Sequence, residues 1–185
     1  MTTPNKAPPG ADPKQLDRTG TVREIGEQAV WSLSSCFPGF GVDQLRGDNL
    51  ETYWQSHGSQ PHLVNIIFRR KTTVKTKCIY ADYKSDLSYT PSKISVMVGN
   101  NFHNLQNIRQ LELVEPQGWI HVPLTDRHKK PTRTFMSQIA VLANHQTGRD
   151  THMRQIVIYT PVEESSWGKF PRCTTIYFMM YRSIR

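Results

Sequence analysis

Residues 48–70 read Asp-Asn-Leu-Glu-Thr-Tyr-Trp-Gln-Ser-His-Gly-Ser-Gln-Pro-His-Leu-Val-Asn-Ile-Ile-Phe-Arg-Arg and join a polar loop to a strand-like run. The first part of this stretch, 48–62, is largely polar and turn-forming but carries two large aromatic residues, Tyr53 and Trp54. A Trp ring can bury about 200 Å² of surface, so we expect this loop to fold back and close one end of a hydrophobic core. The run 63–68 that follows is rich in β-branched and aromatic residues, which predicts a strand.

Further strand-like runs continue at short intervals to the end of the chain. They cover 22–35, 63–68, 74–83, 93–98, 108–114, 119–124, 134–143, 154–159 and 174–181. Short helical turns are expected at 13–18 and 43–46, and Pro and Gly residues between the runs favour turns. Short strands separated by turn formers, with no long helix, predict an all-β sandwich with a short N-terminal helical segment.

The run 74–83 alternates in a way that predicts how it faces the core. Val74, Cys78 and Tyr80 fall on one side of a strand together with Thr76, and Lys75 and Lys77 fall on the other. This is typical of a half-buried antiparallel strand. The pattern therefore predicts that the two lysines face solvent.

Composition favours a single domain in a reducing compartment. A chain of 185 residues can bury a sizeable core without disulfides. Its three cysteines, Cys36, Cys78 and Cys173, are odd in number and far apart, which fits the cytoplasm or nucleus. Residues 1–13 hold four of the twelve prolines and predict a flexible arm. Because no run approaches the roughly 20 apolar residues of a membrane span, no membrane association is expected.

The basic balance of the chain leaves nucleic acid open as a partner. The net charge is +8 and the sequence pI is about 9.6. The densest groups are 69–71 with Lys75 and Lys77, and the cations between 127 and 133. Solvated strand ends and loops are the usual explanation of such groups, because the cations are scattered and form no long block. A nucleic-acid partner is therefore kept only as an alternative.

No known catalytic or metal-binding pattern occurs in the sequence. His145 and His152 lie seven residues apart, which is neither a helical pair nor the close spacing typical of a zinc site. Phosphate-binding, dinucleotide-binding and hydrolase motifs are missing, as are a RING-type zinc cluster and a recognisable active-site cysteine. We therefore expect no catalytic residues, no metal and no cofactor.

The specific residues at 53–62 indicate more than a loop that leads into a strand. Tyr-Trp-Gln-Ser-x-Gly-x-Gln-Pro-His resembles the DOC domain, and with the rest of the chain it resembles the DOC-domain subunits of the anaphase-promoting complex, a ubiquitin ligase. The resemblance covers nearly the whole chain. It implies a β jelly roll of the galactose-binding type, here a domain over 14–172 followed by a final strand and docking tail over 173–185.

The resemblance also implies a non-catalytic function. Such a subunit recognises substrate degrons jointly with a WD-repeat coactivator and promotes processive ubiquitination, in the nucleus and cytoplasm. Its partners are TPR-repeat and other subunits of the complex. The degron-binding positions implied in this chain are Ser88, Tyr89, Thr90, Asn144, His145, Thr147, Arg149, Asp150 and His152.

The loop around Gly148 has the chemistry that this role needs. Residues 142–154 offer amide, imidazole, guanidinium, carboxylate and hydroxyl groups on a tight turn between two hydrophobic runs. Such groups can hydrogen-bond an extended peptide. Without the resemblance, an ordinary polar hairpin loop would be the preferred interpretation, because most connecting loops are polar.

The carboxyl end carries a second candidate site. Ile184 and Arg185 combine an apolar side chain, a cation and a free carboxylate, which give a groove three distinct contacts. The resemblance implies that this Ile-Arg end docks on a TPR-repeat subunit.

Several positions depart from what the resemblance leads us to expect. Gly47, His57 and Leu87 stand where acidic residues are expected, Thr147 where Asn is expected, and Tyr177 where Asp is expected. Phe37, Lys77 and Trp167 are unusual as well. The lost carboxylates raise the net charge, and Phe37, Leu87 and Trp167 would add apolar surface wherever they are exposed.

Three classes of function follow from these observations. A substrate-recognition subunit of a ubiquitin ligase is favoured. The alternatives are a free-standing β-sandwich module that binds a glycan or nucleic acid, and an enzyme whose site is dispersed in sequence. A defined Ile184-Arg185 end favours the first over the second, because a free-standing module has no need of one.

Overall fold

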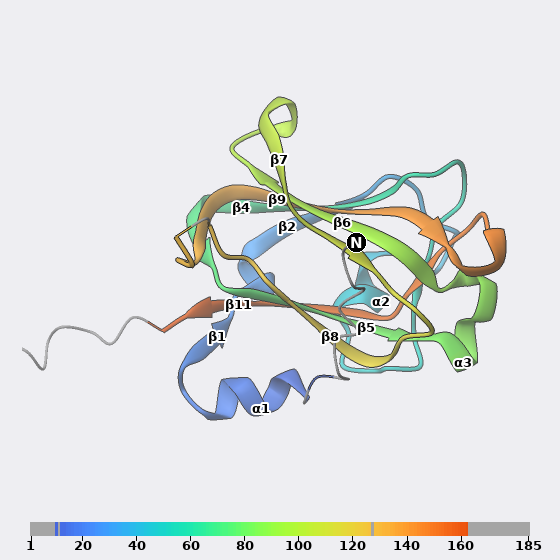
Figure 1. The fold of residues 1–185 in the computed structure, drawn as a ribbon, viewed down its shortest axis with the longest axis horizontal. Helices are drawn as coiled ribbons and strands as arrows, with labels where there is room; N and C mark the ends of the chain where they lie inside the picture. The colour runs from blue at the N-terminus through green and yellow to red at the C-terminus, as the bar shows by residue number, and fades with distance from the viewer. Residues whose placement is uncertain (1–9, 11, 127, 163–185) are drawn as a thin grey trace, which may run out of the picture.

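The computed structural model describes residues 10, 12–126 and 128–162 of the chain, which form a sandwich of two antiparallel sheets (Figure 1). One sheet has the order β1 (Val22–Glu24), β11 (Gln155–Pro161), β5 (Thr76–Asp82), β8 (Gln117–Pro123). The other has the order β2 (Ala29–Leu33), β4 (His62–Val74), β9 (Thr132–Asn144), β6 (Pro91–Gly99), β7 (Leu105–Glu112). A small third sheet pairs β3 (Trp54–Gln55) with β10 (His152–Met153). The predicted all-β sandwich is confirmed.

Short helices fill the connections between strands. They are α1 (Pro13–Arg18), α2 (Val42–Arg46) and α3 (Tyr83–Asp86), with the 3₁₀ turns η1 (Gly26–Gln28), η2 (Leu87–Tyr89), η3 (Phe102–Asn104) and η4 (His145–Thr147). The helical turn predicted at 13–18 is confirmed as α1. It begins there because the Asp12 carboxylate accepts a hydrogen bond from the Lys14 backbone N–H and Pro13 occupies the first turn. The turn predicted at 43–46 is present as α2.

The strand predicted over 22–35 is wrong as a single strand. The Glu24 carboxylate accepts a hydrogen bond from the Gly26 N–H at 2.6 Å, and Trp31 Nε1 donates to the Gly26 carbonyl at 2.9 Å. These bonds stabilise η1, which divides the run between the two sheets. The other strands predicted between 63 and 159 are present with shifted ends, whereas β3 and β10 were not predicted. The strand predicted over 174–181 lies outside the described residues.

The aromatic loop closes the core as the sequence predicts. Trp54 is completely buried, and its Nε1 donates to the Ser35 carbonyl at 2.9 Å. The buried residues of β4 follow the period of two, with Val64, Ile66 and Phe68 facing inward. Together with the inward residues of β9, β5 and β11 they form the main core between the sheets.

The predicted facing of β5 is wrong. Lys77, Ile79 and Ala81 face the main core, and Lys77 is completely buried, where its Nζ donates to Ser137 Oγ at 2.5 Å. Cys78 and Tyr80 face the opposite side of the sheet. That side is covered too, by Trp119 and Tyr159 with Leu16 of α1 packed against them, so both faces of β5 are apolar and alternation could not orient the strand. The basic residues at 69–71 are exposed, as predicted.

The end of the predicted N-terminal arm packs against this outer face. The Gly10 N–H donates to the Trp119 carbonyl at 2.9 Å, and Pro13 is buried, where its carbonyl accepts the Tyr159 hydroxyl at 2.9 Å. Residues 1–9 and 11 of the arm lie outside the described part of the chain, as do the docking tail and Trp167 and Tyr177. The described helices include none long and apolar enough to cross a membrane.

Candidate recognition loops

The two predicted recognition loops meet at one end of the sandwich. Ser88–Thr90 follows α3, and 144–152 connects β9 to β10. The Thr90 carbonyl accepts hydrogen bonds from both the backbone N–H and the ring Nδ1 of His145, each at 2.9 Å. Gly148 lies so close to Ser88 that an added Cβ would be 2.0 Å from the Ser88 carbonyl oxygen. The structure therefore makes one continuous surface of two segments that are far apart in sequence.

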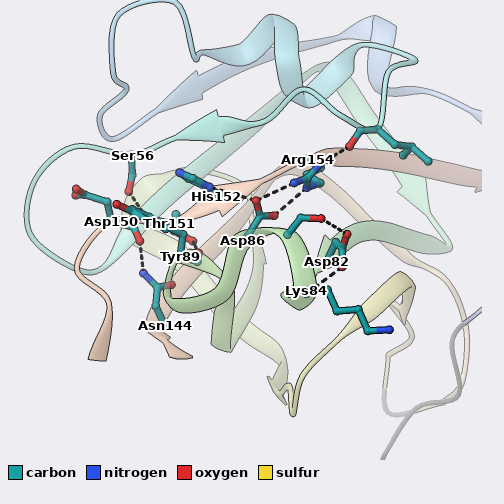
Figure 2. Close-up of polar contacts among 12 residues, drawn as sticks. Ser56, Asp82, Lys84, Asp86, Tyr89, Asn144, Asp150, Thr151, His152 and Arg154 are labelled. Carbon is teal, nitrogen blue, oxygen red and sulfur yellow. Dashed lines mark hydrogen bonds and ion pairs between the residues drawn. The ribbon is translucent and has the colours of Figure 1, made fainter. Parts of the chain in front are cut away.

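A third loop, 56–62, belongs to this surface and was not predicted as part of the site. Gln60 Nε2 donates to the Gly148 carbonyl at 3.0 Å, and Arg149 Nε donates to the Gly58 carbonyl at 3.1 Å. The Ser56 hydroxyl accepts the Thr151 N–H at 2.8 Å (Figure 2). The polar motif at 53–62 was the available signal, since its Ser, Gly and Gln residues make these contacts.

A buried ion pair joins the segments that carry these loops. Asp86, at the end of α3, receives Arg154 Nε and Nη2 at 2.8 Å each, and His152 Nδ1 lies 3.3 Å from the same carboxylate (Figure 2). Arg154 Nη1 also donates to the Leu50 carbonyl at 2.8 Å. We call Asp86, His152 and Arg154 the clasp, because they join segments at 50, 86 and 152.

The clasp is stabilised by charge despite its burial. The side chain of Asp86 is 4% exposed and that of Arg154 11%. Burial by itself would raise the pKa of Asp86, but hydrogen bonds from His152 and Arg154 outweigh it and hold that pKa below its usual value. Hydrogen bonding to Asp86 also raises the pKa of Arg154. Asp86 is therefore ionised at neutral pH, and the pair is a bidentate, charge-assisted contact.

Aromatic stacking fixes His152 further. Its ring lies between Tyr53 and Tyr89, with centroid distances of 4.1 and 4.2 Å and interplanar angles of 22° and 9°. Tyr53 stacks in turn on Phe40 at 5.2 Å. The aromatic residue Tyr53, predicted from sequence to close the core, thus also supports the loops. Tyr89, at the other end of the stack, is 40% exposed.

The predicted site residues divide into a surface set and a supporting set. Tyr89, Thr147 and Arg149 are exposed, whereas Ser88, His145, Asp150 and His152 are partly exposed and Thr90 and Asn144 are buried. Asn144 Nδ2 donates to the carbonyls of Gly148 and Asp150 at 3.2 and 2.7 Å, so it shapes the turn from inside. A ligand on the surface of these loops would contact the exposed set first.

Buried polar atoms with no hydrogen-bond partner in the described chain concentrate in these loops. They include Thr90 Oγ1, Asn144 Oδ1, Asp150 Oδ1 and His152 Nε2. Each such group costs roughly 1–3 kcal/mol, and unsatisfied groups in folded proteins are uncommon enough to mark functional sites. These loops therefore contain buried polar atoms that form no hydrogen bond within the described chain.

Two of the departures have a positive φ on this surface. Leu87 has a positive φ of 44° and is 53% exposed, and Thr147 has a φ of 56°. A β-branched residue in the left-handed region is strained, whereas Asn, the residue expected there from the resemblance, tolerates it. His57 lies in the 56–62 loop, where its ring is 6.3 Å from Phe37. Gly47 lies outside these loops, and its carbonyl accepts the side-chain amide of Gln155.

The described residues contain no group of three or more His, Cys, Asp or Glu side chains arranged to hold a metal ion. Cys78 Sγ lies 3.3 Å from His121 Nδ1. Burial raises the pKa of Cys78 to about 12, so this thiol is not a nucleophile at neutral pH. The exposed polar side chains of the loops offer hydrogen-bond donors and acceptors.

Comparison with solved structures defines the fold type. The family 32 carbohydrate-binding module of C. perfringens NanJ, in complex with galactose, matches 75% of this chain and 99% of its own with a TM-score of 0.63 and 12% identity. A solved chain with the CBM32-1 and CBM32-2 domains of Clostridium perfringens ZmpB matches 80% of this chain over 38% of its own length, with a TM-score of 0.66 and 11% identity. At these identities the likeness shows the fold alone, and it confirms the predicted jelly roll of the galactose-binding type.

Comparison with sequences defines the family. The family model described as anaphase-promoting complex, subunit 10 (APC10), matches residues 4–183. Anaphase-promoting complex subunit 10 of Homo sapiens is 90% identical over 185 residues, all of both chains. The protein of that name in Drosophila melanogaster is 53% identical over 94% of this chain and 90% of its own. In Saccharomyces cerevisiae, subunit DOC1 is 33% identical over 74% of this chain and 55% of its own. The chain therefore belongs to the family of anaphase-promoting complex subunit 10.

Proposed function

We propose that the chain is a non-catalytic degron co-receptor of the anaphase-promoting complex. Its recognition loops, 88–90 and 144–152 with 56–62 beside them, would bind an extended degron peptide that a WD-repeat coactivator holds at the same time. The observation that carries the proposal is the convergence of polar loops around exposed Tyr89 on a rigid base of ion pair and aromatic stack. Free cysteines at 36 and 78 fit action in the nucleus and cytoplasm.

The chemistry of the loops suits an extended peptide held weakly. An extended backbone leaves its N–H and C=O groups unpaired, and each new hydrogen bond contributes roughly 0.5–1.5 kcal/mol net. A few such contacts give little affinity alone. When the coactivator holds another part of the same degron, the second contact becomes intramolecular and gains from effective concentration. The subunit would thus lengthen the residence of the substrate and increase the number of ubiquitins added per encounter.

A loop variant tests this role. We expect Ser88→Ala, Thr147→Ala and Arg149→Ala together to weaken degron binding to the assembled ligase about tenfold, because these partly or fully exposed side chains supply direct contacts. Ubiquitin chains formed per encounter should shorten, as measured in single-encounter ubiquitination with the reconstituted ligase and coactivator. The matched control replaces exposed Gln106, Asn107 and Gln110 of β7 with Ala. Unchanged processivity in a folded, incorporated loop variant would contradict the proposal.

We also propose that the carboxyl end docks the subunit on a TPR-repeat partner. Ile184 would enter an apolar pocket, and the Arg185 guanidinium and the terminal carboxylate would make charge-assisted bonds. Deleting both residues should lower recovery of the subunit with the purified complex severalfold and leave its melting temperature unchanged. If the truncated chain co-purifies with the TPR subunit at the full-length yield, docking lies elsewhere.

A further inference from the structure

The sandwich carries a basic surface at the end opposite the recognition loops. Strands β4 and β9 pair at Ile67↔Met136 and again at Thr72↔Thr134. Between these pairs, residues 68–71 of β4 stand opposite a single residue of β9, Phe135. This large bulge displaces Arg69, Arg70 and Lys71 from the ladder, and all three are exposed.

Other cations lie beside the bulge. Arg133 pairs with Thr73 of β4. The loop before β9 is closed by hydrogen bonds from Thr132 N to the Leu124 carbonyl and from Asp126 N to the Lys130 carbonyl, which keep Lys130 near the start of β9. Lys130 and Arg133 are exposed, and Phe135 is 40% exposed. We define the bulge surface as Arg69, Arg70, Lys71, Lys130, Arg133 and Phe135.

Few carboxylates balance the positive charge of the bulge surface. The ion pairs of the described chain join Lys14 to Asp48, Lys93 to Glu112, and the clasp residues to each other, and none includes a cation of the bulge surface. Asp126 adds one carboxylate to this end, beside five cations. Bulges at functional surfaces commonly redirect side chains toward a partner. The arrangement therefore suits a polyanion.

We infer that the bulge surface is a second docking surface, which binds an acidic segment of another protein subunit that also carries apolar side chains. Guanidinium groups pair bidentately with carboxylates, and Phe135 gives an apolar contact between the cations. Single-stranded nucleic acid is less well suited, because such sites use several aromatic rings along a groove and here one ring is exposed. The chain also belongs to a family of subunits of a protein complex.

The bulge surface acts independently of the recognition loops. Arg133 and Asn144 lie near opposite ends of β9, which at about 3.3 Å per residue places them about 35 Å apart (Figure 1). A degron on the loops and a partner on the bulge can therefore be bound at once. Loss of binding at the bulge surface would not by itself alter the recognition loops, so each proposal can be contradicted without the other.

The test compares two variants of equal net charge. One replaces Arg69, Arg70 and Lys71 with Gln, and the control replaces exposed Arg18, Arg23 and Arg109 with Gln. The probes are a labelled 20-residue peptide of alternating Glu and Leu and a 20-nucleotide oligothymidylate, titrated against the full chain at low and physiological salt. We expect the bulge variant to bind the peptide about tenfold more weakly than the parent and the control to lose less than threefold.

A second measurement uses the reconstituted ligase. Retention of the subunit during washes of rising salt should fall at lower salt for the bulge variant than for the control, with circular dichroism and melting unchanged. Equal losses in both variants would overturn the inference, because they would reflect net charge alone. Tighter, bulge-dependent binding of oligothymidylate than of the peptide would also overturn it, in favour of a nucleic-acid surface.

Discussion

Replacing Lys77 with Met is expected to raise the melting temperature at pH 7 by about 5–15 °C, a gain of roughly 2–4 kcal/mol in unfolding free energy. Lys77 is completely buried between the sheets, and in the described chain its Nζ has one hydrogen-bond partner, Ser137 Oγ. Met fills a similar volume without a charge to desolvate. Ser137 stays satisfied in the variant, because its hydroxyl also donates to the Met97 carbonyl at 3.0 Å.

The gain should depend on pH in a defined direction. Burial lowers the pKa of Lys77 from 10.5 to about 7, whereas the amine of the unfolded chain keeps its ordinary pKa. Between these values the unfolded chain binds more protons, so the parent's unfolding free energy rises with pH by up to about 1.4 kcal/mol per unit. The Met variant lacks this slope. Its advantage should be largest at pH 7 and below, and should narrow toward pH 10.

The control for this effect is Lys75→Met. Lys75 is partly exposed and lies two residues away, outside the main core, so its replacement should change the melting temperature little. Melting curves from pH 6 to 10 for the parent and both variants measure the effect. A Lys77→Met chain that melts no higher than the parent at pH 7 would show that the Lys77 charge is solvated in the folded protein.

Replacing Asp86 with Ala should have the largest destabilising effect, roughly 3–5 kcal/mol of unfolding free energy. The variant leaves Arg154 buried, 11% exposed, without its carboxylate partner. Adding Arg154→Met should recover part of the loss, because it removes the uncompensated cation. Denaturant unfolding of the two variants and the parent gives these differences.

The exposed pair Lys14–Asp48 provides the comparison. Its side chains are 61% and 91% exposed, so Asp48→Ala should change stability by no more than about 0.5 kcal/mol.

The stabilisation that Asp86 provides should be lost in acid. Its folded pKa lies below the ordinary 3.8, so its stabilisation is complete above that value and is lost as the pH falls through the lower folded pKa. Equal effects of the two aspartates at pH 7 would contradict the role of the clasp.

Local signals predicted much of the fold. The helical turn predicted over 13–18 is α1, and the β-branched run after the aromatic loop predicted the central strand β4. The orientation of β5 could not be predicted, because apolar residues occupy both of its faces and Lys77 interrupts the inner one. The break at η1 depends on side-chain bonds from Glu24 and Trp31, for which the strand pattern has no signal.

The recognition loops came from the family resemblance more than from pattern. The residues around Gly148 look like any polar turn, and only their contact with Ser88 and Thr90 makes a shared surface. The clasp joins Asp86 to Arg154 across 68 residues, and no local feature of either position marks the pair. His152 was predicted as a ligand contact, and in the structure its ring stacks on Tyr53 and Tyr89 and supports the loops.

In the proposed function, a degron contacts the recognition loops while the coactivator holds it. Photo-crosslinking tests this contact with a degron peptide that carries a photoreactive residue at successive positions, in the ligase assembled with its coactivator. We predict crosslinks within the tryptic peptides 85–93, 134–149 and 150–154 of this subunit, at Ser88, Tyr89 and the residues from Thr147 to Asp150. Crosslinks confined to the coactivator, or found on this subunit only outside the loops, would contradict the claim.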